Sequence, residues 1–242
     1  VHPDKWFGLL AYREVQDPPS FPLHPRVVPF ITKDRMAWFD PEVRARETAL
    51  IEQWKEKAEN IAWYDYIYGT PYVLPRVYPH LMAENYQYAK ENGVIAHYAE
   101  IYPNWGEGPK GYVSLKLQWN PNQDVDALLD EWYERAVGPA AAPYLKAYYE
   151  LWEEFWTTRV PGSPWFESRK NAVYLAFNQP GYLDLATDAD IALSRWLLEM
   201  AVANADTPER HYYAPVGTAA KGTIQLALNY RNAAGTQIGA WR

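Results

Sequence analysis

Residues 60–100 read NIAWYDYIYGTPYVLPRVYPHLMAENYQYAKENGVIAHYAE, and this stretch decides the fold class. It begins and ends with short apolar runs, 60–68 and 94–99, that have the length and the aromatic and β-branched content of strands. Between them, residues 78–92 have helical spacing, and Gly93 is a residue type that commonly ends helices. A strand, a helix and a second strand in this order predict a parallel βαβ unit.

The same alternation extends toward the N-terminus. Residues 5–12 and 26–32 read KWFGLLAY and RVVPFIT, two further apolar runs with a proline-rich segment between them. Residues 41–59 follow with helical spacing, and Pro41 stands where a first helical residue is expected after Asp40. Near-continuous apolar strands are typical of parallel sheets. We therefore expect four consecutive parallel strands.

After residue 111 the pattern becomes helical throughout, and we expect helices at 123–137, 139–158, 186–203 and 219–232. This change favours a division into a sheet-containing part, residues 1–111, and an α-helical region, residues 112–242. Four parallel strands cannot close an eight-stranded barrel. The α/β part is therefore either a small open sheet or the second half of a TIM-like (β/α)8 barrel. We favour the half-barrel, and we expect an exposed apolar strand edge at 6–12 or 94–99.

Composition narrows the function classes. The chain has 242 residues, of which 48% are hydrophobic and 16% aromatic, with 12 Trp and 20 Tyr. A net charge of −7 argues against a nucleic-acid partner. The absence of Cys excludes disulfides and thiolate metal sites, and the five His show no ligand spacing. No apolar run is long enough to span a membrane. No nucleotide-binding motif and no metal-ligand spacing stand out, so we expect no cofactor and no metal.

Two neighbouring predicted strands end in carboxylates, Asp65 and Glu100. Catalytic residues of barrel enzymes lie at such strand ends. Neighbouring parallel strands are about 4.8 Å apart, so the two carboxyl groups are expected within the range of about 5–9.5 Å that glycoside hydrolysis uses. The alternative is that one of them pairs with Arg35 or Arg76 and serves the structure alone.

Aromatic residues surround these strand ends. Tyr and Trp offer an apolar ring and a polar tip, which is the combination that a sugar needs. A simpler explanation for many of the aromatic residues is a helical core. The residues that we expect to bind substrate are Tyr12, Tyr66, Tyr98, Tyr102, Trp105 and Glu107, the last three on a glycine-rich loop.

Several short motifs carry a family resemblance. They are an AY…PP strand end (Ala11, Tyr12, Pro18, Pro19), the YDY strand (Tyr64 to Tyr66), the strand that ends in Glu100, and a KLQWNP helix (Lys116, Leu117, Trp119, Asn120, Pro121). Over residues 1 to about 160 the chain resembles bacterial proteins that contain domain of unknown function 4838, part of which is classed as glycoside hydrolase family 163.

This resemblance implies a TIM-like barrel followed by helices, in an exported bacterial protein that is periplasmic, secreted or on the cell surface. It also implies an endo-β-N-acetylglucosaminidase-like activity on N-glycans and, as a partner, a further half-barrel upstream in the same protein. We therefore expect a glycoside hydrolase with Glu100 and Asp65 as acid and base. Two alternatives stay open: a non-catalytic glycan-binding or scaffold protein, and a glycosidase of the α-glucuronidase or agarase type, with Arg13, Arg35 or Arg76 binding a uronic acid.

Overall fold

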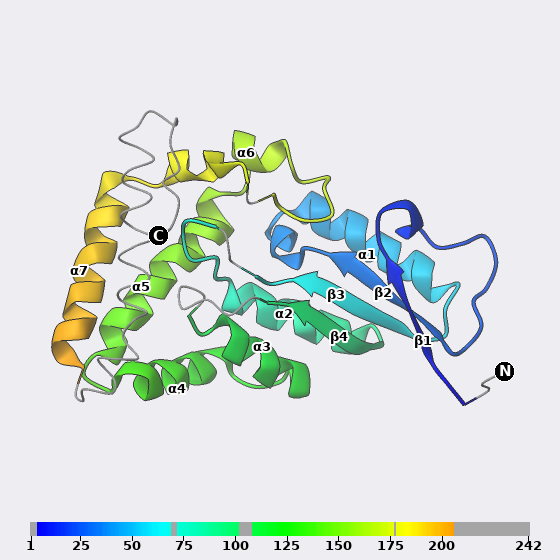
Figure 1. The fold of residues 1–242 in the computed structure, drawn as a ribbon, viewed down its shortest axis with the longest axis horizontal. Coiled ribbons are helices and arrows are strands. Elements are labelled where there is room, and N and C mark those ends of the chain that lie inside the picture. Colours follow the sequence, from blue (N-terminus) through cyan, green and yellow to red (C-terminus); the bar gives the residue numbers. More distant parts are fainter. Residues whose placement is uncertain (1–3, 69–71, 102–107, 177, 206–242) are drawn as a thin grey trace.

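The computed structural model describes residues 4–68, 72–101, 108–176 and 178–205 (Figure 1). Its sheet has four strands, β1 (Phe7–Ala11), β2 (Val27–Lys33), β3 (Ile61–Tyr66) and β4 (Val94–Glu100). The strands lie in the order β1-β2-β3-β4, and every neighbouring pair is parallel. The prediction of four consecutive parallel strands is confirmed.

Two long helices connect the strands and lie behind the sheet in the view of Figure 1. Helix α1 (Pro41–Lys55) joins β2 to β3, and α2 (Pro79–Glu91) joins β3 to β4. The start of α1 follows the sequence prediction, because Asp40 accepts hydrogen bonds from the backbone N–H groups of Glu42 and Val43. A short 3₁₀ helix follows each of the first two strands: η1 (Arg13–Val15) after β1 and η2 (Arg35–Phe39) after β2.

The rest of the described chain is helical. It contains α3 (Lys110–Trp119), α4 (Val125–Val137), α5 (Ala142–Glu154) with a π-helical continuation (Phe155–Arg159), α6 (Pro164–Glu167), a 3₁₀ segment (Pro180–Leu185) and α7 (Asp188–Asn204). The helices predicted at 123–137, 139–158 and 186–203 are confirmed. Helix α3 contains Lys116, Leu117 and Trp119 of the KLQWNP motif, which was expected to be helical. The helix expected at 219–232 lies outside the described residues. None of the described helices is long and apolar enough to cross a membrane.

The register of the strands sorts their side chains onto two faces. Trp63 is aligned with Ile31 and His97, on the face that the helices cover. Tyr64 is aligned with Tyr98, and Tyr66 with Glu100, on the opposite face. Alternate residues of a strand point to opposite sides, so the tyrosines of β3 all leave the sheet away from the helices. We call this second side the open face.

Both edge strands, β1 and β4, expose large apolar side chains. Phe7 and Leu10 of β1 are 57% and 51% exposed, and Ile95 and Tyr98 of β4 are 57% and 54% exposed. The prediction of an exposed apolar strand edge is therefore confirmed at both sides of the sheet. Unpaired edges of this kind are places where a further strand can add.

Two buried ion pairs fix the carboxyl ends of the strands. Asp65 of β3 accepts a hydrogen bond of 3.0 Å from the backbone N–H of Arg35, and its other carboxyl oxygen is 3.9 Å from the Arg35 guanidinium. Asp34, which follows β2, pairs with Arg76 and also accepts a hydrogen bond from the backbone N–H of Leu175. Leu175 comes from the helical part, so the Asp34 carboxylate ties that part to the sheet.

A surface ion triad joins α2 to α4 and α5. The ring nitrogens of His80 are 2.8 Å from Glu153 and 3.2 Å from Asp126. The hydrogen bond to Glu153 is the main reason that the pKa of His80 rises to about 9. Because this folded-state pKa exceeds the ordinary value of about 6.5, the triad stabilises the fold fully below about pH 6.5. That stability is lost as the pH rises through about 9.

We therefore expect His80→Ala to remove a pH-dependent part of the free energy of unfolding. Since the His80 side chain is 46% exposed, solvent screening should keep this part below about 1 kcal/mol. Urea unfolding of both proteins at pH 6 and pH 9.5 measures it, and the difference between the proteins should shrink at the higher pH. If the two proteins differed equally in their free energy of unfolding at both pH values, the pH dependence could not be assigned to His80.

Candidate functional site

A group of tyrosines and one carboxylate lies on the open face, toward the carboxyl ends of the strands. We call it the tyrosine face; it consists of Tyr12, Tyr64, Tyr66, Tyr98, Glu100 and Tyr174. The rings of Tyr64 and Tyr98 are stacked with centroids 4.7 Å apart. Tyr66 continues the row, with its ring 5.4 Å from that of Tyr64 and 5.1 Å from that of Tyr174. The row thus forms a continuous band of aromatic rings across β3 and β4, exposed at Tyr98 and buried at Tyr66.

Tyr12 borders this surface from β1. It follows Ala11, the last residue of the strand, and the alternation of side chains places it on the open face beside Tyr66. Burial, followed by the nearby Tyr12, raises the pKa of Tyr66 far above its ordinary value. The Tyr66 hydroxyl group therefore stays protonated at neutral pH and can donate a hydrogen bond.

Glu100 is the carboxylate of the tyrosine face. It is the last residue of β4 and is half-buried. The Tyr64 hydroxyl donates a hydrogen bond of 2.5 Å to Oε2 of Glu100. Because both residues lie on neighbouring strands and Tyr64 is also stacked on Tyr98, this bond holds the carboxylate in a fixed place on the sheet.

Asp65 does not belong to this site. The register aligns Tyr66 with Glu100 and Asp65 with Ala99, so the two carboxylates point to opposite faces of the sheet. Asp65 is only 2% exposed and is occupied by Arg35. The expectation that Asp65 and Glu100 form a catalytic pair is therefore wrong, and the alternative, that Asp65 pairs with Arg35, is confirmed. A difference of one residue in register changes the face of a side chain, which explains the error.

Two of the arginines expected to bind a uronic acid are also excluded. Arg35 and Arg76 are 0% and 1% exposed. Arg35 donates hydrogen bonds to the carbonyl oxygens of Ile31 and Tyr64, besides its contact with Asp65. Arg76 is bound to Asp34 and to two carbonyl oxygens. Neither guanidinium can reach a ligand, whereas Arg13 is exposed beside Tyr12.

The structure brings together four of the expected site residues, Tyr12, Tyr66, Tyr98 and Glu100. It adds two that sequence reasoning missed. Tyr64 lies two residues before Tyr66 and shares its face, so the strand alternation could have identified it. Tyr174 comes from a distant loop, and no sequence signal places it there.

The remaining expected site residues, Tyr102, Trp105 and Glu107, lie outside the described residues. In the described part of the chain, no group of three or more His, Asp or Glu side chains is arranged to hold a metal ion.

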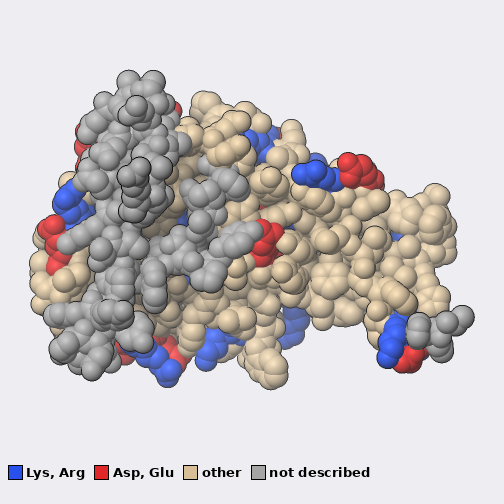
Figure 2. Space-filling model, in the orientation of Figure 1, with Lys and Arg blue, Asp and Glu red and all other residues tan. Residues whose placement is uncertain are grey.

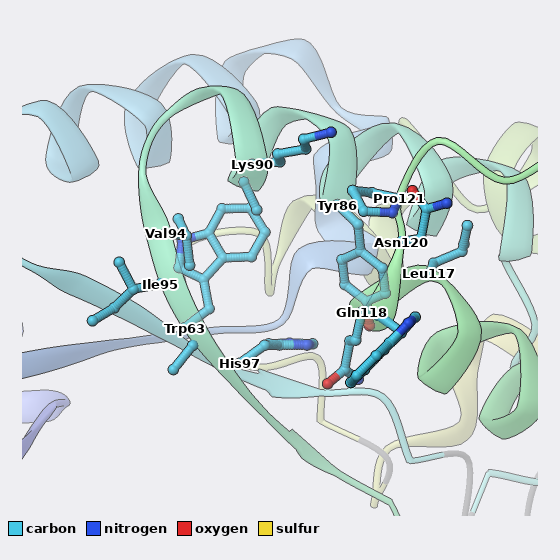
Figure 3. Close-up of a pocket in the computed structure, with 13 residues that line it drawn as sticks. Trp63, Tyr86, Lys90, Val94, Ile95, His97, Leu117, Gln118, Asn120 and Pro121 are labelled. Atoms are coloured by element: carbon cyan, nitrogen blue, oxygen red, sulfur yellow. The ribbon is translucent and has the colours of Figure 1, made fainter.

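A separate cavity lies on the helix side of β4, between this strand, α2 and α3 (Figure 3). Its volume is about 430 Å³, and its walls include Trp63, Tyr86, His97 and Trp119. Burial lowers the pKa of His97 to about 3, so the imidazole stays neutral at physiological pH. His97 thus faces away from Glu100, as the strand pattern predicts, and the cavity is not part of the tyrosine face.

The part of the molecule that contains the sheet shows mostly uncharged side chains in the view of Figure 2, with acidic and basic residues in small separate groups. A surface without an extended charged patch suits a ligand that is bound through rings and hydroxyl groups.

Comparison with known proteins gives one match. A family model described as a domain of unknown function, DUF4838, matches residues 1–150. The chain belongs to the DUF4838 family. The matched part of this DUF4838 protein contains the whole sheet and all of the tyrosine face except Tyr174. No curated protein and no solved structure matches the chain.

Proposed function

We propose that this DUF4838 protein is a glycoside hydrolase in which Glu100 serves as a catalytic carboxylate. The observation that carries the proposal is the Glu100 carboxylate itself, held by the Tyr64 hydroxyl at 2.5 Å. It stands at the carboxyl end of a parallel strand, where barrel enzymes place their catalytic groups. A carboxyl group in this position can protonate the leaving oxygen of a glycosidic bond or act as a base toward water.

The aromatic surroundings favour a sugar as the substrate. The Tyr98 ring is 54% exposed and stands beside the carboxylate on the same strand face. An exposed ring costs free energy in water, and a sugar ring stacked on it would recover part of that cost. The half-buried Tyr12 borders the same row of rings, and its hydroxyl group can make a hydrogen bond to a sugar hydroxyl.

A second catalytic group must come from elsewhere, because Asp65 is excluded. We propose that it belongs to another half of the same barrel. Four parallel strands in sequential order, with helices α1 and α2 behind the sheet, are compatible with half of a (β/α)8 barrel and support this proposal. The exposed edges of β1 and β4 would then pair with an upstream half-barrel of the full protein. Alternatively, an N-acetyl group of the substrate attacks the anomeric carbon, and a carboxylate orients it.

The finer assignment rests on the family resemblance. We propose an endo-β-N-acetylglucosaminidase-like activity on N-glycans, as in glycoside hydrolase family 163, in an exported bacterial protein. The AY…PP and YDY motifs that carry the resemblance contribute Tyr12, Tyr64 and Tyr66 to the tyrosine face.

The decisive experiment replaces Glu100 by Gln in the full-length parent protein. This change keeps the shape of the side chain and removes its titrating proton. We expect glycan release from a glycoprotein to fall at least about 100-fold, the low end of general acid–base catalysis. Glu91→Gln, on the surface of α2, is the matched control and should release glycan at the wild-type rate. Wild-type release by folded Glu100→Gln protein would contradict the catalytic role.

Tyr64→Phe tests how the carboxylate is held. The change removes one hydrogen bond to a charged group and leaves the ring that stacks on Tyr98. Such bonds are worth about 1.5–3 kcal/mol, so we expect kcat to fall roughly 10- to 100-fold, with a smaller change in KM. The control is Tyr112→Phe, which removes a similar bond of 2.6 Å to Glu131, between α3 and α4 and outside the tyrosine face. Equal effects of both changes would contradict the positioning role of Tyr64.

A non-catalytic glycan-binding protein is the second candidate. It is favoured by one observation: the tyrosine face, as described, contains a single carboxylate. Measuring glycan affinity and glycan release for the wild type, Tyr98→Ala and Glu100→Gln distinguishes the two functions. A binding protein would lose affinity with Tyr98→Ala and show no glycan release in the wild type.

A further inference from the structure

We propose that the glycan bound at the tyrosine face carries a carboxylate, from a uronic acid or a sialic acid, and that Arg13 binds it. This inference rests on the proposed function and adds to it the chemical class of the substrate. Three observations carry it: the place of Arg13, its lack of an acidic partner, and its backbone conformation.

Arg13 stands directly beside the tyrosine face. It follows Tyr12 at the carboxyl end of β1, and its guanidinium carbon is 5.1 Å from the centroid of the Tyr12 ring. Its side chain is exposed. A ligand that covers Tyr12 therefore passes within reach of the Arg13 guanidinium.

No carboxylate of the described residues lies within ion-pair distance of Arg13. Other arginines of the chain are satisfied: Arg35 and Arg76 by buried aspartates, and Arg159 by two acidic side chains. The Arg13 guanidinium also contacts the Tyr12 side chain. Because it has no acidic partner among the described residues, its remaining N–H groups can make a planar, two-point contact with a carboxylate.

The backbone of Arg13 is also unusual. Its φ angle is +49°, and within the described chain it is the single residue other than glycine with a positive φ. An L-residue pays a conformational cost in this left-handed region, where glycine would fit without strain. An arginine at such a position is more easily explained when its side chain has a task at the site.

The sheet geometry separates this contact from the reaction centre. Arg13 follows β1 and Glu100 ends β4, three strand spacings of about 4.8 Å apart, or about 14 Å across the sheet. The carboxylate and the bond that Glu100 acts on therefore belong to different sugar units. This arrangement suits a glycan chain that carries an acidic sugar at some distance from the cleaved bond. It argues against an α-glucuronidase activity.

The test measures binding with the full-length protein carrying Glu100→Gln, so that no glycan is cleaved. A uronate-containing oligosaccharide and a sialylated N-glycan are each titrated by calorimetry against their carboxyl-reduced, neutral forms. We expect one acidic form to bind at least about 10-fold more tightly than its neutral form, as a charged two-point contact should. The acidic form that shows this preference identifies the source of the carboxylate.

In the same background, Arg13→Met should bring the two affinities within about 2-fold of each other and leave the neutral form unaffected. Arg135→Met, which removes an exposed arginine of α4, controls for the change in net charge and should keep the preference. Arg13→Gly relieves the backbone strain, so it should fold at least as well as the parent and still lose the preference.

Equal affinity for acidic and neutral glycans would overturn the inference and leave glycan binding intact. A preference that survives both Arg13 changes would also overturn it, because another residue would then bind the carboxylate. Failure of every glycan to bind would overturn the proposed function together with the inference.

Discussion

Arg76→Met should destabilise the protein by about 3–5 kcal/mol, the cost of leaving one member of a buried ion pair without its partner. Arg76 is 1% exposed and pairs with Asp34, which is 3% exposed. Its Nη1 also donates to the carbonyl oxygens of Tyr66 and Tyr68, at 2.7 and 2.9 Å. One side chain thus satisfies a buried charge and two buried acceptors.

Asp34 explains why the loss is large. Burial by itself raises the pKa of Asp34, and the Arg76 guanidinium is the main influence that opposes this rise. Without Arg76, the carboxyl group must either stay charged in an apolar environment or take up a proton. In both cases the folded state is destabilised relative to the unfolded chain, where Asp34 is hydrated.

Urea unfolding followed by circular dichroism measures the effect. Arg44→Met is the control, because Arg44 makes a surface ion pair with Glu84 at 3.5 Å and its removal should cost less than about 1 kcal/mol. The double change Asp34→Asn with Arg76→Met should be less destabilised than Arg76→Met, since the uncompensated charge is gone. A cost for Arg76→Met as small as that for Arg44→Met would contradict the ion-pair argument.

Gly108→Ala should destabilise the protein by about 2–5 kcal/mol. Gly108 has a φ of +59°, where an alanine costs about 1–2 kcal/mol. A Cβ at this position would also lie 2.4 Å from two carbon atoms of the Tyr149 ring. Tyr149 is 2% exposed and packs against Tyr133 and Tyr148, so its ring cannot move aside without disturbing the helical core. Such overpacking adds about 1–3 kcal/mol.

Gly93→Ala separates the two contributions. Gly93 has a φ of +73°, but no atom lies within 4 Å of the position of its Cβ. Its replacement should carry the conformational cost alone, about 1–2 kcal/mol. Thermal unfolding of both variants gives the comparison. If the two variants lost the same stability, the contact with Tyr149 would not restrict the fold at Gly108.

The local sequence was enough to predict the sheet and most of the helices. Strand and helix periodicities are properties of short segments, so the runs at 60–68 and 94–99 could be identified without knowledge of their surroundings. Helix α3 was expected only from the KLQWNP motif and without bounds, because its ten residues are flanked by glycine and proline and bury only a narrow stripe around Val113 and Leu117. Lys110 at its start is fully buried, with its ammonium donating to the Arg76 carbonyl at 2.5 Å, which no pattern of apolar residues predicts.

The candidate site was predicted in part. Glu100, Tyr66 and Tyr98 were found because a strand end and the alternation of side chains are visible in the sequence. The pairing of Glu100 with Tyr64 was not found, since it depends on how β3 and β4 are aligned. That alignment includes a register shift between Ile61 and Ala62, which only packing decides.

The sequence by itself therefore determined which residues stand at the ends of the strands and that aromatic side chains surround them. The tertiary structure decided which carboxylate is available to a ligand. Arg35, 30 residues before Asp65 along the chain, folds against it and buries it on the helix side, whereas Glu100 accepts a hydrogen bond from the Tyr64 hydroxyl of the neighbouring strand and stays half-buried on the open face. Both carboxylates look alike in the sequence because contacts between distant residues, and not local pattern, set the burial of a charge.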